Sequence, residues 1–204
     1  MSADTMPRPI CRSLRQQRGV TLIEMIVVVL ISTMLITVAA VGIGAFFRKY
    51  RELTAWAELQ KDALDCLNLI KNGVSVGSGN TMEYYGVANA QQLRLINTTT
   101  NTGSGIRITP PSSQGLQTPN FALFYLYDGA VRCTYMHRGI QVASPLYIFP
   151  KEENLDKMIV DKFQISKINN ESEVLAVQVV LHARVKTGTE NFRAIKFSTK
   201  MTKK

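Results

Sequence analysis

The hydrophobic residues near the start of the chain form one long run. Val20 to Phe47 is apolar apart from a few hydroxyl side chains and one charged residue, Glu24. As a helix, its 28 residues would extend about 42 Å, more than the roughly 30 Å hydrocarbon core of a bilayer. The pattern therefore predicts a transmembrane helix over 20–47.

The helical pattern continues beyond this run in an amphipathic form. The charged residues between positions 51 and 65 fall largely on other faces than the apolar ones, and Asn72-Gly73 is a typical helix stop. We therefore expect one helix over 20–71, with Trp56 in contact with a core. The apolar stripe is expected to comprise Leu53, Trp56, Ala57, Ala63, Leu64, Leu67 and Ile70.

The later part of the chain has the two-residue period of β-strands. Asp128-Gly129 separates two runs rich in aromatic and branched residues, which predicts a hairpin over 121–136. A two-residue loop there pairs Tyr127 with Ala130. The same register directs one set of side chains to the buried face of the sheet: Phe124, Leu126, Val131, Cys133 and Tyr135.

Three further strands and two loops complete the prediction. Strands are expected over 159–168, 174–186 and 192–199, with Asn169-Asn170 and Thr187-Gly188-Thr189 as the breaks between them. Polar or proline-rich composition predicts surface loops over 97–105 and 110–119. The buried side of the long strand is expected to carry Leu175, Val177, Val179, Leu181, Ala183 and Val185.

Together these elements predict an α+β fold, in which a long N-terminal helix packs against an antiparallel β-sheet domain. The apolar face of the sheet would cover the amphipathic second half of the helix. Residues 72–204 are enough for one compact domain. The expected organisation is a hydrophilic leader over 1–19, the helix over 20–71 and the globular domain over 72–204.

Glu24 is unusual because an ionised carboxylate within a membrane segment is costly and typically functional. The leader before it is basic, and Gly19 precedes the apolar run, whereas the cleavage site of a secretory signal peptide follows its apolar region. Cleavage after Gly19 would create an amine on Val20, one helical turn from Glu24. That amine, or the one of a neighbouring subunit, would neutralise the carboxylate.

The stretch Arg18-Gly19-Val20-Thr21-Leu22-Ile23-Glu24, followed by a long apolar helix, resembles the N-terminus of type IV pilins and of the pseudopilins of type II secretion systems. The resemblance covers about the first 50 residues. It implies cleavage after Gly19 by a prepilin peptidase, methylation of the new N-terminus at Val20, and a role for Glu24 in filament assembly. Val20 departs from the phenylalanine or methionine more usual in that family.

The resemblance also implies location and partners. The chain would be a single-pass inner-membrane protein with a cytoplasmic leader and a globular domain that is periplasmic, or extracellular after assembly. Its partners would be other pilin or pseudopilin subunits, the prepilin peptidase and the assembly platform. The order of elements is most similar to the larger, J-like minor pseudopilins.

Net charge adds a weak indication. The formal charge is +9, and +6 without the leader's four arginines and Asp4. Because the basic residues are dispersed along the sequence and form no run of five or six, nucleic acid is not a favoured partner. A DNA-uptake pilin remains an alternative, as does a signal-anchored periplasmic protein unrelated to pilins.

Candidate catalytic chemistry is sparse. His137 and His182 lack metal-ligand spacing and are expected to be polar surface residues, and no nucleophile elbow, phosphate loop or Cys-x-x-Cys motif occurs. Three carboxylates, Glu152, Glu153 and Asp156, lack the spacing of a calcium loop. We predict no enzymatic activity, no cofactor and no metal.

Two cysteines remain if the leader is removed. Cys66 on the helix and Cys133 on the hairpin are both directed toward the helix–sheet interface. In an oxidising compartment they would form a disulfide if their Cα atoms came within about 7 Å. Two buried free thiols are the favoured alternative, because cysteine commonly behaves as a small apolar residue.

Overall fold

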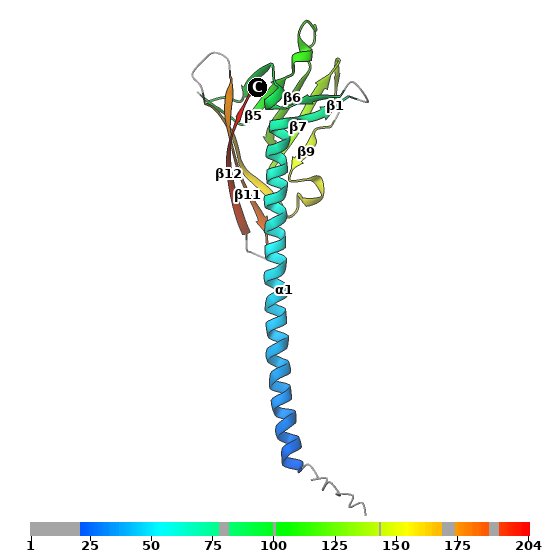
Figure 1. The fold of residues 1–204 in the computed structure, drawn as a ribbon, viewed down its shortest axis with the longest axis vertical. Helices are drawn as coiled ribbons and strands as arrows, with labels where there is room; N and C mark the ends of the chain where they lie inside the picture. Colours follow the sequence, from blue (N-terminus) through cyan, green and yellow to red (C-terminus); the bar gives the residue numbers. More distant parts are fainter. Residues whose placement is uncertain (1–20, 78–81, 100, 143, 169–173, 188–191) are drawn as a thin grey trace, which may run out of the picture. The chain divides into compact units, whose positions relative to one another are not determined.

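A computed structural model describes residues 21–77, 82–99, 101–142, 144–168, 174–187 and 192–204 (Figure 1). The chain divides into two compact units, Met1–Phe47 and Arg48–Lys204. The boundary between the two units falls within the long N-terminal helix.

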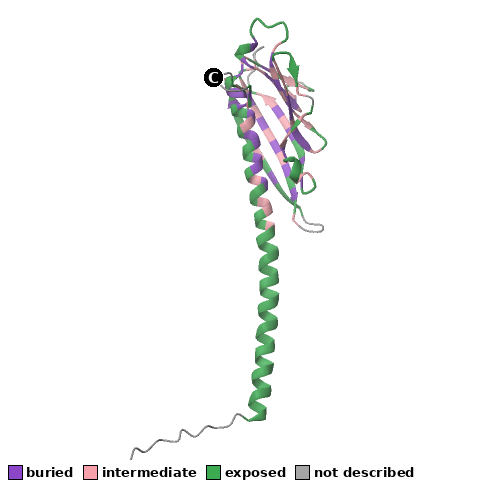
Figure 2. Ribbon diagram, turned by 90° about the vertical axis from the view of Figure 1, so that its right-hand side faces the viewer, coloured by how far each residue is buried: buried purple, intermediate pink, exposed green. Residues whose placement is uncertain are grey.

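The first unit contains the beginning of helix α1, which runs from Leu22 to Asn72. Every residue from Leu22 to Phe47 is exposed, although nearly all are apolar (Figure 2). The hydroxyl groups of Thr33 and Thr37 donate to the carbonyls of Leu30 and Thr33, each at 2.8 Å. Their polar groups are thereby satisfied within the helix, as a membrane interior requires.

The second unit contains the end of α1 and all the strands, which form three antiparallel sheets and confirm the α+β fold. The two-stranded sheet contains β1 (Val74–Val76) and β2 (Glu83–Tyr85). The six-stranded sheet contains β3 (Gln92–Ile96), β5 (Gly105–Thr109), β6 (Phe121–Tyr127), β7 (Ala130–His137), β8 (Ile140–Gln141) and β9 (Leu146–Phe149). The four-stranded sheet contains β4 (Thr102–Gly103), β10 (Met158–Lys167), β11 (Ala176–Lys186) and β12 (Phe192–Thr202), and short 3-10 helices are η2 (Val87–Asn89), η3 (Pro111–Ser113) and η4 (Glu152–Asn154).

Helix α1 ends where the sequence predicted a stop. Gly73 has a φ of +104° and its N–H donates to the Leu69 carbonyl at 2.8 Å. A glycine in this left-handed conformation closes the last turn without the strain that a side chain would add.

The hairpin prediction is confirmed in both position and register. Strands β6 and β7 pair Tyr127 with Ala130 and Phe124 with Cys133. Asp128 and Gly129 both have positive φ, 52° and 67°, as a type I′ turn requires. Phe124, Val131 and Cys133 are fully buried, whereas Leu126 and Tyr135 are half-buried.

The three late strands are also confirmed, with shifts of a few residues at their ends. β12 extends to Thr202, and Leu175 is 41% exposed and precedes β11, so it is not part of the buried row. The predicted break at Asn169-Asn170 and most of the turn at 187–189 lie outside the described residues.

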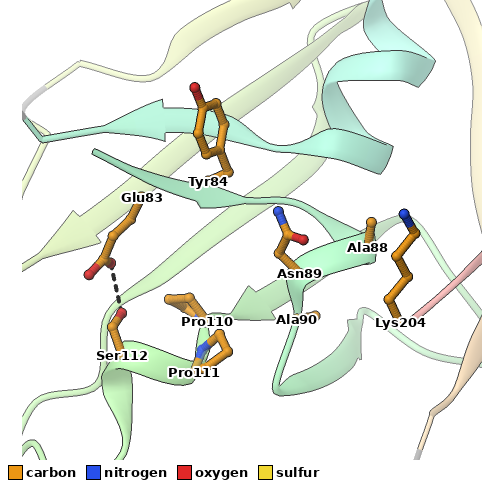
Figure 3. A pocket seen from close by; sticks show the side chains of 9 residues that line it. All are labelled: Glu83, Tyr84, Ala88, Asn89, Ala90, Pro110, Pro111, Ser112 and Lys204. Carbon is orange, nitrogen blue, oxygen red and sulfur yellow. Dashed lines mark hydrogen bonds between the residues drawn. The ribbon is translucent and has the colours of Figure 1, made fainter. Parts of the chain in front are cut away.

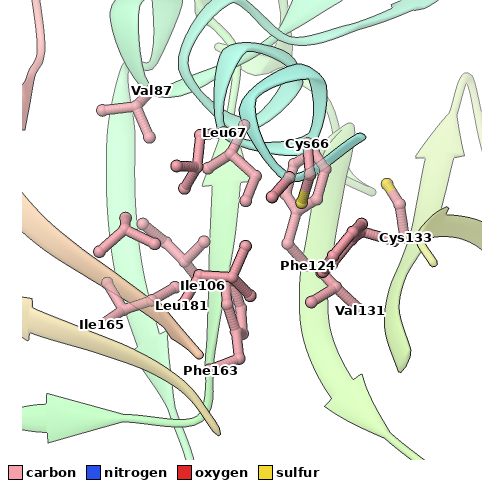
Figure 4. Packing of buried hydrophobic residues seen from close by; sticks show 14 of the residues in the cluster. Cys66, Leu67, Val87, Ile106, Phe124, Val131, Cys133, Phe163, Ile165 and Leu181 are labelled. Carbon is pink, nitrogen blue, oxygen red and sulfur yellow. The ribbon is translucent and has the colours of Figure 1, made fainter. Parts of the chain in front are cut away.

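One hydrophobic core joins α1 to both larger sheets. Leu59, Ala63, Cys66, Leu67 and Ile70 of α1 are buried, and Trp56 packs at the edge of this cluster as expected. Figure 4 shows Cys66 and Leu67 facing side chains of both sheets: Ile106, Phe124 and Val131 from the six-stranded sheet, and Phe163, Ile165 and Leu181 from the four-stranded one. The sheets therefore cover one face of the helix.

Part of the predicted helix stripe is wrong. Leu53 and Leu64 are 56% and 48% exposed, and Ala57 is exposed too, whereas Asp62 is buried. Residues 59, 62, 63, 66, 67 and 70 follow the three- and four-residue spacing of a single face, which excludes position 64. Burial of the Asp62 carboxylate is tolerated because the Lys151 ammonium lies 3.2 Å from it.

The prediction of a surface loop over 97–105 is wrong for its last residues, which form strands. Thr102 and Gly103 form β4, which pairs with Ser166 and Ile165 of β10, and β5 begins at Gly105. A Cβ at Gly103 would lie 2.6 Å from the Ile96 carbonyl oxygen. Close backbone approach thus recruits a polar, glycine-containing segment into the sheet.

Replacing Gly86 with alanine is expected to destabilise the second unit. A Cβ at this position would overlap the backbone of Asn72 and Gly73, where α1 ends. We expect a loss of about 1–3 kcal/mol in the free energy of unfolding, as for overpacked sites. Thermal unfolding of the full chain in detergent measures this loss of stability.

Gly42→Ala is the control, because an added Cβ at Gly42 would meet nothing within 4 Å. Equal melting temperatures for the two variants would contradict the prediction.

Candidate functional site

The N-terminus of α1 is organised around Thr21 and Glu24. The Thr21 N–H donates to Glu24 Oε2 at 2.8 Å, and the Thr21 hydroxyl donates to the same oxygen at 3.1 Å. The Glu24 N–H is 3.3 Å from Thr21 Oγ1, which accepts its hydrogen bond. This reciprocal arrangement is a capping box.

The capping box gives Glu24 a structural role that the sequence analysis missed. The signal was present, because Thr21-Leu22-Ile23-Glu24 has the Thr-x-x-Glu pattern of a capping box. A carboxylate in the first turn also interacts favourably with the helix dipole. The cap thus explains why a long polar side chain is placed here, although a neutral glutamine can also form a capping box.

The charge of Glu24 is not compensated within the described part of the chain. None of the ion pairs formed by the described residues includes Glu24. The surface around it is apolar and exposed, and α1 is the one described helix that is long and apolar enough to cross a membrane. If this segment is buried in lipid or protein, the carboxylate must either take up a proton or pair with a cation from outside these residues.

Gly19 and Val20, the predicted cleavage and methylation positions, lie outside the described residues. Cleavage between them would leave Thr21 as the second residue of the product. Its N–H would still be available for the cap, and the new amine would be one residue away from that N–H.

Two ion pairs connect the second half of α1 to the rest of its unit. Glu52 accepts from Arg193 of β12 at 2.7 Å and from Lys49 at 2.8 Å. Hydrogen bonds from Lys49 and Arg193 lower the pKa of the Glu52 carboxyl. Asp62 raises the pKa of the Lys151 ammonium by hydrogen bonding and charge. These pairs hold charged positions of the helix against specific segments of the domain.

A pocket of about 400 Å³ lies beside η2 and η3 (Figure 3). Its polar groups include Glu83, Asn89 and Lys204, and Ser112 donates to Glu83 Oε2 at 2.7 Å. The Ser112–Glu83 hydrogen bond and the Lys204 ammonium make the pocket partly polar. The pocket offers polar contacts but no recognisable catalytic arrangement.

His137 is not the lone surface residue that was expected. Its Nδ1 lies 2.5 Å from the Tyr85 hydroxyl and 4.0 Å from Glu83, and its side chain is 16% exposed. Burial and the Glu83 charge raise the pKa of Tyr85. His182 does face outward from β11, but it is half-buried and its Nε2 has no hydrogen-bond partner among the described residues.

No group of three or more His, Cys, Asp or Glu side chains in the described ranges is arranged to hold a metal ion. Glu152 and Glu153 lie in or beside η4 and are exposed, as is Asp156.

Cys66 and Cys133 are both buried and free. Burial raises the pKa of both thiols, that of Cys133 to about 12. The proximity of Cys133 contributes to the raised pKa of Cys66. Both thiols are therefore parts of the apolar core, protonated at neutral pH.

Comparison with known families finds one motif, in the N-terminal segment. Residues 14–40 match a family model described as a prokaryotic N-terminal methylation motif. This short match includes Gly19, Val20 and Glu24. No curated protein and no solved structure matches the chain significantly.

Both cysteines are expected to resist alkylation in the folded full chain. With a pKa of about 12 for Cys133, only about one thiol in ten thousand is ionised at pH 8. Iodoacetamide followed by mass spectrometry should label neither residue until denaturant is added. Ser75→Cys, at an exposed position, is the reactive control, and a Cys66–Cys133 disulfide in the native protein would refute the assignment.

Proposed function

We propose that this chain, whose methylation motif is characteristic of type IV pilins and pseudopilins, is a minor pilin or pseudopilin subunit of an envelope-spanning filament machine. It serves a type II secretion system or a type IV pilus. The observation that carries the proposal is the motif at residues 14–40, of which residues 22–40 form the exposed apolar start of α1.

The first stage of this function is membrane insertion. The segment from Leu22 to Phe47 has no covering side chains, its only charge is Glu24, and its threonine hydroxyls are satisfied within the helix. Such a surface is stable in lipid but not in water. The chain is inserted once in the inner membrane, with its globular domain periplasmic, or extracellular after assembly.

The second stage is processing. The prepilin peptidase cuts after Gly19, and the new N-terminus at Val20 is methylated. An N-methylated amine keeps its positive charge at neutral pH. Processing therefore leaves an ammonium group next to the capping box and removes a hydrophilic leader that would otherwise remain at the end of the apolar helix.

Assembly uses the same apolar surface. The helix leaves the bilayer and packs against equivalent helices of other subunits on the assembly platform. Gly42 and Gly44 have open space where a Cβ would lie, with no atom within 4 Å, and so allow close approach of a neighbouring helix. Glu24 pairs with an N-terminal amine, its own or a neighbour's, and selects the register because an unpaired charge between apolar helices is strongly disfavoured.

The role is structural. This assignment rests on the methylation motif, which is characteristic of pilins and pseudopilins, proteins that are structural subunits. We assign no enzymatic activity.

Gly19→Ala is expected to abolish processing. In cells that contain the peptidase, mass spectrometry should find wild-type protein beginning at Val20 and the variant retaining residues 1–19. Gly44→Ala, the same substitution within the helix, should be processed normally. Wild-type protein that keeps its leader as the sole species would favour the alternative of an unprocessed signal anchor.

The charge and the capping role of Glu24 are expected to separate in three variants. Glu24→Gln keeps a cap but removes the charge, and should reduce incorporation into filaments at least tenfold, as should Glu24→Ala. Thr21→Val removes the two hydrogen bonds of the cap that involve the Thr21 hydroxyl but keeps the charge, and should assemble within about twofold of wild type. Incorporation is measured by quantifying subunits in sheared filaments after processing has been verified.

The pattern of these variants decides between the two roles of Glu24. Normal assembly of Glu24→Gln together with failure of Thr21→Val would reverse the assignment, because capping rather than charge would then be essential.

A further inference from the structure

The outward side of the six-stranded sheet has an unusual composition. Its inward side packs Ile106, Phe124 and Val131 into the core beside α1 (Figure 4), and the alternate residues of each strand point outward. We call the outward side of β3, β5, β6, β7 and β9 the arginine–aromatic face. The six strands of this sheet contain no lysine, aspartate or glutamate. They contain three arginines, and all three point outward: Arg94, Arg107 and Arg132.

Arg132 on β7 is held between two tyrosine rings. Its Cζ lies 4.8 Å from the centroid of the Tyr127 ring and 4.4 Å from that of Tyr147. Its Nε is buried and has no hydrogen-bond partner among the described residues. Stacking against two rings restricts the side chain before any partner arrives. The other N–H groups of this guanidinium are therefore pre-organised for an acceptor.

A second ordered guanidinium lies two strands away, on β5. Arg107 has its Cζ 4.1 Å from the centroid of the Phe121 ring. Arg94 on β3 is exposed and lies directly opposite Arg107 in the register, where like charges repel. None of the ion pairs formed by the described residues includes any of the three arginines. Their positive charge is therefore uncompensated within the described part of the chain.

Stabilisation of the sheet accounts for only part of this pattern. Cation–π pairs are a common feature of sheet surfaces, and they explain why Arg107 and Arg132 lie beside aromatic rings. They do not explain an arginine opposite Arg107 or six strands without a carboxylate. Protein–protein interfaces have this composition, because they are enriched in aromatic residues, Met and Arg and depleted in Lys, Glu and Asp. Leu123 and Met136 add half-buried aliphatic surface to the same face.

We propose that the arginine–aromatic face is a docking site for an acidic segment of another protein. This interaction goes beyond the function proposed above, which uses α1, and does not depend on it. Carboxylates of the segment pair with the planar guanidinium groups, which match them in geometry. Apolar side chains of the segment cover the rings and exclude water from these pairs.

The dimensions of the face favour a single segment as the occupant. The five strands extend about 20 Å across the sheet, and their outward positions extend about 13–20 Å along it. The resulting area of at most about 400 Å² is well below the roughly 800 Å² that each partner buries in a typical stable complex. A second copy of this chain is disfavoured for the same reason, and because it would place arginines against arginines.

Nucleic acid is a less suitable occupant of this face. Lysines commonly contribute to the binding of phosphates, and the six strands have none. Bases stack on open aromatic rings, whereas guanidinium groups already lie over Phe121, Tyr127 and Tyr147.

The test uses the full-length chain in nanodiscs of zwitterionic lipid. The probe is a fluorescently labelled random copolymer of glutamate and tyrosine, which supplies carboxylates and rings, and fluorescence anisotropy should show saturable binding. Arg107→Glu with Arg132→Glu should weaken binding at least about tenfold. Lys162→Glu with Lys196→Glu makes the same charge change at exposed positions of the other large sheet, and should weaken it less than about threefold. Absence of wild-type binding, or equal losses in the two variants, would overturn the proposal.

A variant that conserves charge tests the role of the stacked guanidinium groups. Arg107→Lys with Arg132→Lys keeps the net charge but loses the planar fork, and should weaken binding about threefold or more. Undiminished binding would mean that net charge is sufficient, and would overturn the assignment to this face. Arg94→Gln, at an exposed position, gives an independent and milder test, with an expected loss of about twofold. Unchanged melting temperatures show that each variant is folded.

Competition and sedimentation identify the class of partner. Unlabelled copolymer should displace the probe far more effectively than duplex DNA or anionic vesicles at the same concentration of negative charge. Equal displacement by DNA or vesicles would assign a general attraction for anions and overturn the proposal. In sedimentation of the protein in detergent, self-association that Arg107→Glu with Arg132→Glu abolishes would assign the face to a second copy instead.

Discussion

The structure depends on burial of one face of α1 between Leu59 and Ile70. Five apolar side chains and Asp62 lie on this face, and both large sheets direct their inner rows toward the same cluster. Without the helix part of these rows would be exposed to water, since α1 is the one α-helix among the described residues. The first half of α1 differs, because its own unit covers none of its apolar side chains and they remain exposed. One helix thus has an exposed apolar surface in its first half and a face buried in the domain core in its second half.

Much of the fold follows from local patterns. The Asp128-Gly129 hairpin and the alternation in β11 could be predicted because turn chemistry and strand period act over a few residues. The error in the predicted apolar stripe of the helix arises from tertiary packing, which local patterns do not contain. Whether Leu64 or Asp62 faces the core depends on where the sheets lie around the helix, and Asp62 is tolerated only because distant Lys151 reaches it. The pairing of β4 with β10 likewise depends on the tertiary approach of Gly103 to Ile96.

The candidate site also contains features that a local sequence motif suggests and features that depend on the tertiary fold. Gly19, Val20 and Glu24 could be proposed from the sequence because their motif is local, with Val20 one helical turn from Glu24. The contact of His137 with Tyr85 could not be predicted, since it joins strands that are far apart in the chain.

The capping box sharpens the reason for an acid at position 24. Capping requires only that a side chain reach back three residues and accept a hydrogen bond, which a glutamine also does. A carboxylate adds a charge, and that charge is unfavourable in an apolar helix surface unless a cation is near. The described residues provide no such cation within ion-pair distance. The excess cost of glutamate over glutamine is understandable if an ammonium group arrives later, and the proposed cleavage before Val20 would create one beside the cap.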